Sequence, residues 1–177
     1  MSDTLSAAKT PHAPDIDPDG EPPADLDDVV DARIENADFS NLRFLKSSLR
    51  RVELHLCRLT GIELAEATWS DVDLTDCRGD YDGLRNAKLE RVAFRDCRLE
   101  EADFGGASLT DVVFERCTLR RASFAGCRNE RLHLVGCDLA ELVGVEALRG
   151  ARMPFGDILE NGPLFAQALG IQVIPEE

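Results

Sequence analysis

The chain has 177 residues, enough for one domain with one continuous core, so two separate cores are not expected. Acidic residues outnumber basic ones by 34 to 20, and the resulting net charge of -14 disfavours direct binding to nucleic acid or an anionic membrane. No apolar run is long enough to span a membrane and no signal peptide begins the chain, so we expect a cytoplasmic protein.

Residues 1–30 carry much of the acidity. They contain eight Asp or Glu residues against one Lys, together with five of the eight prolines. Almost no large apolar residue precedes Leu26, so the segment buries too little surface to offset the entropy of ordering it. We therefore predict an acidic, proline-rich disordered tail to about Pro23, followed by an N-terminal cap.

Residues 31–140 carry a five-residue repeat. From Ile34 to Leu139, every fifth residue is Ile, Phe, Leu or Trp at 20 of 22 positions, the exceptions being Gly79 and Asn129. Two residues before each of these, 21 of 22 positions are small or apolar, and Asp82 is the exception. A period of five fits neither a helix nor a plain strand. It predicts two inward side chains separated by an outward one, then two corner residues, so the chain must coil.

Longer spacings give the number of pentapeptides per coil, because like residues stack in a solenoid. Cysteine recurs every 20 residues, at Cys57, Cys77, Cys97, Cys117 and Cys137. Outward residues alternate in charge at the same spacing, at Arg51, Asp71, Arg91, Asp111 and Arg131. Four pentapeptides per coil predict a square cross-section, and about 5.5 coils predict a parallel β-solenoid roughly 26 Å long.

These pentapeptides resemble the pentapeptide repeat family, whose consensus is Ala-Asp/Asn-Leu/Phe-x-x. The segments Ala37-Asp38-Phe39-Ser40-Asn41 and Ala102-Asp103-Phe104-Gly105-Gly106 match it closely. The resemblance implies an all-β fold, a right-handed quadrilateral parallel β-helix, in which the handedness comes from the family and not from the spacing.

Residues 141–177 leave the repeat. Proline and glycine punctuate short helical patterns around residues 157–160 and 164–169, which predict a cap over the apolar end of the last coil. The segment from Leu148 to Ile171 is similar to the C-terminal cap of bacterial members of the family, including quinolone-resistance proteins that bind DNA gyrase. That resemblance implies a possible homodimer through this region, with Leu164, Phe165 and Leu169 as candidate cap or dimer contacts.

The sequence offers no constellation for catalysis, so we expect no enzyme. All six cysteines lie in the inward register without close Cys or His pairs, which predicts buried free thiols and no zinc site. His12 falls in the tail, while His55 and His133 project outward about four coils apart, so no nucleophile, base and orienting group come together. Gly105 and Gly106 are corner residues and not a phosphate loop. No cofactor or metal is expected.

Two outward features are candidate partner-binding residues. Arg58, Arg78 and Arg98 form a basic stripe, which either engages an acidic partner or pairs with Asp38, Asp80 and Glu100; we favour the pairing. The stretch from Arg78 to Gly83 contains the only tyrosine, Tyr81, and places Asp82 where an apolar residue belongs. We expect a local bulge there, either a binding spot or, as we favour, a tolerated defect.

Two functions fit these observations. The first is a rigid, non-catalytic interaction module whose protein partner is unidentified. The second is a DNA mimic that binds DNA gyrase and modulates quinolone action. Residues 31–140 contain 17 basic against 20 acidic residues and so net only -3, whereas B-DNA of this length carries about 15 negative charges. Mimicry would need one acidic face, for instance around Glu63, Glu66 and Asp103.

Overall fold

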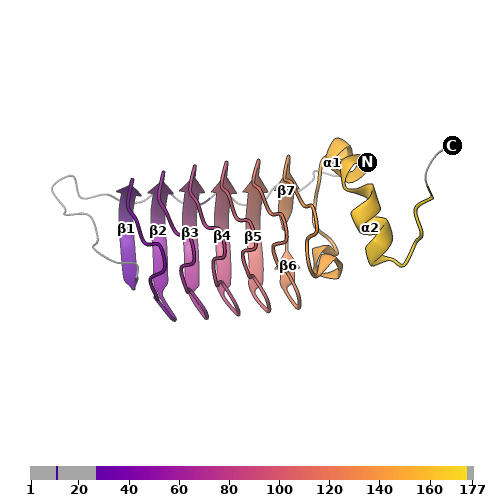
Figure 1. Cartoon of the computed structure of the whole chain (residues 1–177). Helices are drawn as coiled ribbons and strands as arrows, with labels where there is room; N and C mark the ends of the chain where they lie inside the picture. Colours follow the sequence, from indigo (N-terminus) through magenta and orange to yellow (C-terminus); the bar gives the residue numbers. More distant parts are fainter. Residues whose placement is uncertain (1–10, 12–26, 175–177) are drawn as a thin grey trace, which may run out of the picture.

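The computed structural model describes residue 11 and residues 27–174 of the chain. Seven parallel strands form one sheet along a rod, and the last two, which are short, lie end to end beside the fifth (Figure 1). They are β1 (Asp28–Glu35), β2 (Ser48–His55), β3 (Thr68–Thr75), β4 (Lys88–Arg95), β5 (Ser108–Glu115), β6 (Arg128–Glu130) and β7 (His133–Val135). Strands β1 to β5 begin 20 residues apart, and paired residues such as Leu49 and Trp69 also differ by 20. The predicted 20-residue coil is therefore confirmed.

Each long strand spans two sides of the coil, and the other two sides are joined by single bridges. One row of bridges runs from Asp38 through Arg58, Arg78, Arg98 and Thr118 to Asp138. The other runs from Arg43 through Glu63, Gly83, Asp103 and Ser123 to Val143. Backbone hydrogen bonds between coils accompany both rows. The molecule is thus a parallel β-solenoid of about five turns with four sides, which confirms the predicted fold class.

The corners explain why the period is five. The second corner residue of nearly every repeat has a positive φ, near 56° at Asn36 and Asn86 and near 70° at Gly61 and Gly106. Asparagine and glycine adopt this left-handed conformation most readily. Each repeat can therefore turn through one corner with a single left-handed residue.

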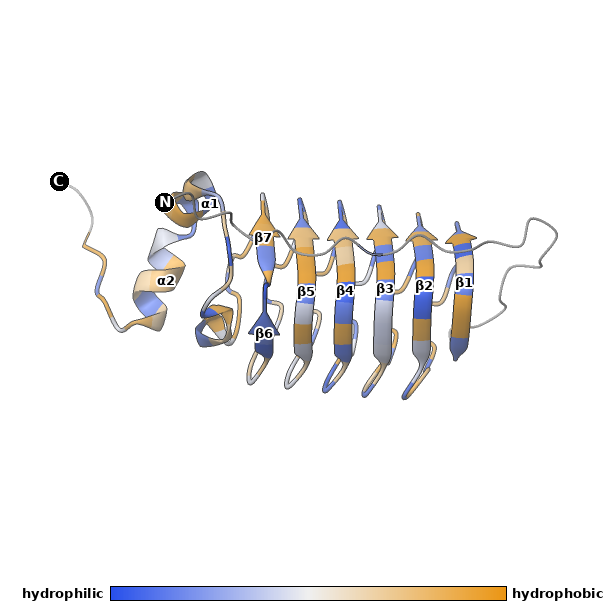
Figure 2. Cartoon of the chain, turned by 180° about the vertical axis from the view of Figure 1, so that it is seen from behind, coloured by the Kyte–Doolittle hydropathy of each residue, from blue (hydrophilic) through white to orange (hydrophobic). Residues whose placement is uncertain are grey.

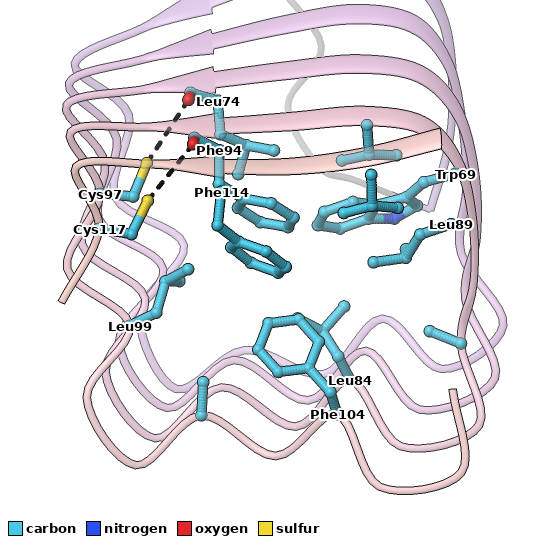
Figure 3. Close-up of a cluster of buried hydrophobic side chains, with 14 of the residues drawn as sticks. Trp69, Leu74, Leu84, Leu89, Phe94, Cys97, Leu99, Phe104, Phe114 and Cys117 are labelled. Carbon is cyan, nitrogen blue, oxygen red and sulfur yellow. Dashed lines mark hydrogen bonds between the residues drawn. The ribbon is translucent and has the colours of Figure 1, made fainter. Parts of the chain in front are cut away.

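The core is built from like residues stacked on one another. Phe94 and Phe114 stack with ring centroids 4.8 Å apart, and Phe104 and Phe124 stack at 4.9 Å. Phe104 also meets Phe114 edge to face (Figure 3). Such ring pairs add stabilisation beyond the burial of their apolar area. In Figure 2 the strands are banded in apolar and polar colours, as expected when alternate residues face the core.

The stretch around Asp82 corrects one expectation, because the chain does not bulge there. The Gly83 amide donates to the Ile62 carbonyl at 2.8 Å, and the Asp103 amide donates to the Asp82 carbonyl at 2.7 Å. The ladder is therefore continuous on both sides of the stretch. The reason lies at Gly79, where an added Cβ would be only 2.1 Å from Asp82 Oδ2. The Asp82 carboxyl fills the volume that the missing side chain of Gly79 leaves.

A helical segment closes the C-terminal end. It comprises η1 (Val145–Leu148), α1 (Phe155–Glu160) and α2 (Gly162–Ala168), and α1 and α2 confirm the two predicted helical patterns. Leu148 is buried in the solenoid core, and Leu164 and Phe165 pack against that core. The helical segment lies beyond the last strands, at the C-terminal end of the rod (Figure 1). The apolar end of the last coil is thereby covered.

Asn129 breaks the repeat because it holds this cap. Its side-chain Nδ2 donates to the carbonyl of Ala147 at 2.6 Å and to that of Arg149 at 3.2 Å. A leucine at this position would leave both carbonyls without that donor. The exception to the apolar register therefore marks the place where the cap meets the solenoid.

We expect Asn129→Ala to destabilise the protein by about 1 to 2 kcal/mol, because two carbonyls lose their shared donor. Asn129→Leu restores the apolar pattern and is the matched variant. If the amide holds the cap, both variants should speed hydrogen exchange in η1, and Asn129→Leu should not be more stable than the parent. A stability gain in Asn129→Leu would show that the pattern outweighs the hydrogen bonds.

Candidate interaction surface

Ion pairs between successive coils neutralise much of the rod surface. Arg91 forms a two-pronged pair with Asp71, with Nε to Oδ1 at 2.6 Å and Nη2 to Oδ2 at 2.9 Å. Arg131 holds Asp111 in the same way, at 2.6 and 2.8 Å. The charge alternation seen in the sequence is therefore a ladder of paired groups. Asp71 and Asp111 were expected to face outward, but both are buried beneath the guanidinium groups that cover them.

The proposed acidic face is also neutralised by pairing. Arg43 lies 2.6 Å from Glu63, Arg85 lies 2.7 Å from Asp103, and Lys46 lies 3.9 Å from Glu66. Each of the three acidic groups thus forms an ion pair with a basic group on an adjacent coil. This side of the rod does not present the dense line of negative charge that DNA mimicry requires.

The three arginines of the basic stripe lie in register on a single side of the rod, each bridged to the next coil. Arg58 pairs loosely with Asp38 at 3.6 Å. Arg98 pairs with Asp80 at 2.9 Å and with Glu100 at 3.2 Å. Among the residues that the structure describes, none forms an ion pair or a side-chain hydrogen bond with the exposed Arg78. The predicted pairing therefore holds at both ends of the stripe but not at its centre.

The other two candidate residues of this region have opposite surroundings. Tyr81 occupies a corner with φ 62° and is 60% exposed. Asp82 is only 2% exposed, and its Oδ1 has no hydrogen-bond partner. Burial, followed by the nearby Asp80 and Cys77, raises the pKa of Asp82 well above its usual range. Asp82 is therefore inaccessible to a partner, and the accessible surface consists of the arginines and Tyr81.

The cysteines form an internal stack as predicted, with one exception. Five of the six are buried, and their thiols donate to backbone carbonyls, such as Cys97 to Leu74 at 3.5 Å and Cys117 to Phe94 at 3.3 Å (Figure 3). Contact with the adjacent thiols in the stack, together with burial, raises the pKa of Cys97. Cys127, on another side, is only half-buried, so the expectation that all six are buried is wrong for this residue.

Thiol labelling of the native protein should therefore modify Cys127 first, and slowly. Burial raises the pKa of Cys127 to about 11, which leaves little of the reactive thiolate at neutral pH. A polar alkylating reagent followed by mass spectrometry measures this, and Cys127→Ser is the control that should remove the native label. Rapid labelling of several thiols before unfolding would contradict the buried stack.

The histidines remain apart in the structure. His55 lies at the end of β2 and His133 at the start of β7. Burial, with Arg152 nearby, lowers the pKa of His133. Over residue 11 and residues 27–174, no group of three or more His, Cys, Asp or Glu side chains is placed to hold a metal ion. None of the helices in that part of the chain is long and apolar enough to cross a membrane.

The cap carries an apolar groove that sequence reasoning did not foresee. It encloses about 290 Å³ and is lined mainly by apolar side chains of η1, α1, α2 and the segment that links η1 to α1, among them Leu148, Met153, Ile158 and Phe165. Leu169 also lines the groove and is 77% exposed. Of the three candidate cap or dimer contacts, Leu164 and Phe165 thus face the solenoid and Leu169 faces solvent.

Comparison with known proteins agrees with this architecture. A family model described as a pentapeptide repeat region matches residues 28–104 and 47–124, which together span more than half of the chain. No curated protein sequence gives a significant match.

Solved structures that match the chain include three pentapeptide repeat or quinolone-resistance proteins. A trypsin-treated form of QnrB1, a plasmid-mediated fluoroquinolone resistance protein, is 20% identical with a TM-score of 0.44, over 81% of this chain and 92% of that one. HetL, a pentapeptide repeat protein involved in heterocyst differentiation regulation from the cyanobacterium Nostoc sp. strain PCC 7120, is 22% identical with a TM-score of 0.41, over 73% and 67%. Rfr23 from the cyanobacterium Cyanothece 51142 is 17% identical with a TM-score of 0.24, over 70% and 82%.

Proposed function

The chain belongs to the pentapeptide repeat family, and on that premise we propose that it is a rigid, non-catalytic module that binds another protein. The observation that carries this proposal is the backbone ladder that joins successive coils on all four sides of the rod. Interstrand hydrogen bonds hold even the irregular stretch, with the Arg78 amide donating to the Cys57 carbonyl at 3.0 Å. Outward side chains are therefore presented at fixed positions, which lowers the entropy lost on binding.

The distribution of reactive groups supports a non-catalytic role. Five thiols are sealed in the core, and the two described histidines sit on separate coils. The buried carboxylates Asp71 and Asp111 are bound by arginines. The carboxyl of Asp82 is enclosed in the core, where a substrate cannot reach it from solvent.

A homodimer through the C-terminal region is a second element of this proposal. Phe155, Leu159 and Leu169 are 77%, 63% and 77% exposed, and all three lie on or beside the cap helices. Burying three such side chains would contribute several kcal/mol, at about 1.5 to 3 kcal/mol each. Sedimentation analysis should detect a dimer that Leu169→Glu weakens; a monomer at all concentrations would remove the dimer and leave the module intact.

The alternative, a DNA mimic acting on DNA gyrase, is less well supported by the charge distribution. The side with Glu63 and Asp103 is neutralised by Arg43 and Arg85. Basic groups also interrupt the adjacent side at Arg58, Arg78 and Arg98. A DNA-binding groove recognises dense negative charge, which this surface lacks. A protein partner that recognises a surface of mixed charge fits better.

The module is tested by capture and reconstitution. The full chain is immobilised, proteins retained from the native cell are identified, and the strongest candidate is purified and titrated against the chain. We expect a saturable one-to-one complex that forms without any chemical change in either protein. If no purified candidate binds, or if the retained species proves to be a small molecule that the chain converts, the proposal is wrong.

A further inference from the structure

We propose that Arg58, Arg78 and Tyr81 form a binding surface for an acidic α-helical segment of the partner protein. The inference rests on the proposed interaction module and assigns the chemistry of its partner. It concerns the side of the rod where isolated bridges join Arg58 to Arg78 and Arg78 to Arg98.

The availability of Arg78 is the first observation. Most other arginines of the solenoid pair with an acidic residue on a neighbouring coil, as Arg91 does with Asp71 and Arg116 with Asp96. The acidic residue placed to neutralise the centre of the stripe is Asp80, but its carboxylate already accepts from the Glu100 amide at 3.0 Å and from Arg98 Nε at 3.1 Å. Within residues 27–174, the Arg78 guanidinium group therefore has no acidic partner, and it is able to form two parallel hydrogen bonds with a carboxylate.

Arg58 extends the positive charge by one coil. Its side chain is 68% exposed, and its pair with Asp38 spans 3.6 Å, too long for a direct hydrogen bond. Exposed pairs of this kind are worth little, so a partner carboxylate can replace Asp38 at small cost. Arg58 and Arg78 thus provide two exposed guanidinium groups from residues in register on adjacent coils.

Tyr81 supplies the apolar component. It lies three residues after Arg78 on the corner of the same coil, and the corresponding corner one coil earlier is Gly61, which has no side chain to cover it. Its backbone is fixed, since the Tyr81 amide donates to the Glu100 carbonyl at 2.9 Å. Tyrosine and arginine are two of the residue types most enriched at the hot spots of protein interfaces.

The spacing of the arginines selects a helix. Adjacent coils lie about 4.8 Å apart. Carboxylates at positions i and i+4 of an α-helix are separated by about 5 to 6 Å at Cβ, close to that spacing. Alternate residues on one face of an extended strand are separated by about 6.6 Å, which fits less well. An acidic helix lying along the rod axis would therefore meet Arg58 and Arg78 with successive carboxylates.

Peptide binding to the full chain tests the surface. The probe is a fluorescent, alanine-rich helical peptide of about 20 residues with Glu pairs at i and i+4, and its counterpart carries Lys at those positions. We expect the Glu peptide alone to bind, measured by fluorescence anisotropy. Arg78→Ala should weaken it roughly tenfold or more, and Tyr81→Ala should also weaken it.

Arg50→Ala is the matched control, because Arg50 is also exposed and has no ion pair within the described chain, but lies on β2 on a different side. Binding that falls equally in Arg50→Ala and Arg78→Ala would reduce the effect to general electrostatics and overturn the proposal. Equally tight, Arg78-dependent binding of duplex DNA would overturn the assignment of the partner class.

The reconstituted partner separates this proposal from the module itself. Unchanged affinity of that partner for Arg78→Ala would leave the module intact and exclude this surface. A matched loss with the partner and with the Glu peptide would support both. Thermal unfolding should be nearly the same for Arg78→Ala and the parent, since the Arg78 side chain is exposed and forms no ion pair with any residue that the structure describes.

Discussion

Gly144→Ala is expected to lower the free energy of unfolding by about 4 kcal/mol, because the alanine methyl would overlap backbone atoms. An added Cβ would lie 2.4 Å from the Ala125 nitrogen, 2.6 Å from the Ala125 Cα and 2.7 Å from the Phe124 carbonyl carbon. The residue also has φ 78°, a left-handed conformation that costs alanine about 1 to 2 kcal/mol. Overpacking against the previous coil adds about 1 to 3 kcal/mol. Chemical denaturation measures the sum.

The control separates conformation from contact. Gly150 has a similar φ of 83°, but nothing lies within 4 Å of its added Cβ. Gly150→Ala should therefore cost only the conformational part, about 1 to 2 kcal/mol. If the two variants lose equal free energy of unfolding, the close approach of Gly144 to Phe124 and Ala125 does not contribute to the loss.

Gly79→Leu is expected to cost about 3 kcal/mol, although leucine is the residue the repeat predicts at this position. Its Cβ would lie 2.1 Å from Asp82 Oδ2 and 2.9 Å from Leu99 Cδ2. The enclosed carboxyl has no room to move aside, since Asp82 is only 2% exposed. Forcing a side chain into an occupied core site strains the surrounding packing.

Combining Gly79→Leu with Asp82→Ala should reverse that loss. The pair then matches the leucine and alanine found at Leu99 and Ala102 one coil later, and the unpaired carboxyl is removed from the core. Relieving a buried, unsatisfied polar group contributes about 1 to 3 kcal/mol, so the double variant should be more stable than the parent. Additive single effects in the double-mutant cycle would contradict the shared volume.

The buried carboxyl of Asp82 also predicts that the stability of the protein depends on pH. Burial raises the pKa of Asp82 above its value in the unfolded chain, which is about 3.9. The folded state then binds more protons, so its stability from this group is present below that unfolded value and is lost as pH rises through the folded pKa. The stability gain of the double variant over the parent should therefore grow as the pH rises above about 3.9, the pKa of Asp in the unfolded chain. Urea titrations at several pH values measure this gain.

The regular features of the fold could be predicted from sequence because they repeat. The five-residue period places Phe94 and Phe114 one coil apart in the core, and they stack as that register requires. The 20-residue spacing likewise places Cys97 over Cys77. Because the same kind of contact recurs on several coils, one exceptional residue does not obscure the pattern.

The exceptions could not be predicted, because each depends on a particular neighbour. Gly79 and Asp82 look like two defects in the pattern, but one supplies the volume that the other fills. Asn129 looks like a lost core residue, yet its partners are carbonyls of the cap, which follows no repeat. The burial of Asp111 depends on the side chain of Arg131, whose conformation the spacing does not specify.

The basic stripe shows the same limit within the candidate site. The sequence places Arg58, Arg78 and Arg98 in one row and nearby carboxylates beside them. It does not reveal that Asp80 is held by Arg98 and the Glu100 amide, which leaves Arg78 without an ion pair among the residues that the structure describes. The distinction between a neutralised stripe and a binding surface depends on that one carboxylate.

The most direct test of the central claim, that this neutralised rod is an interaction module and not a DNA mimic, is a supercoiling assay with purified DNA gyrase across increasing salt. Electrostatic mimicry requires dense negative potential and weakens as salt screens it. Because Glu63 and Asp103 are paired with Arg43 and Arg85, we expect supercoiling to proceed unchanged even with the full chain in large excess. Inhibition at protein concentrations near that of gyrase, relieved by salt, would contradict this account and make the DNA mimic the better explanation.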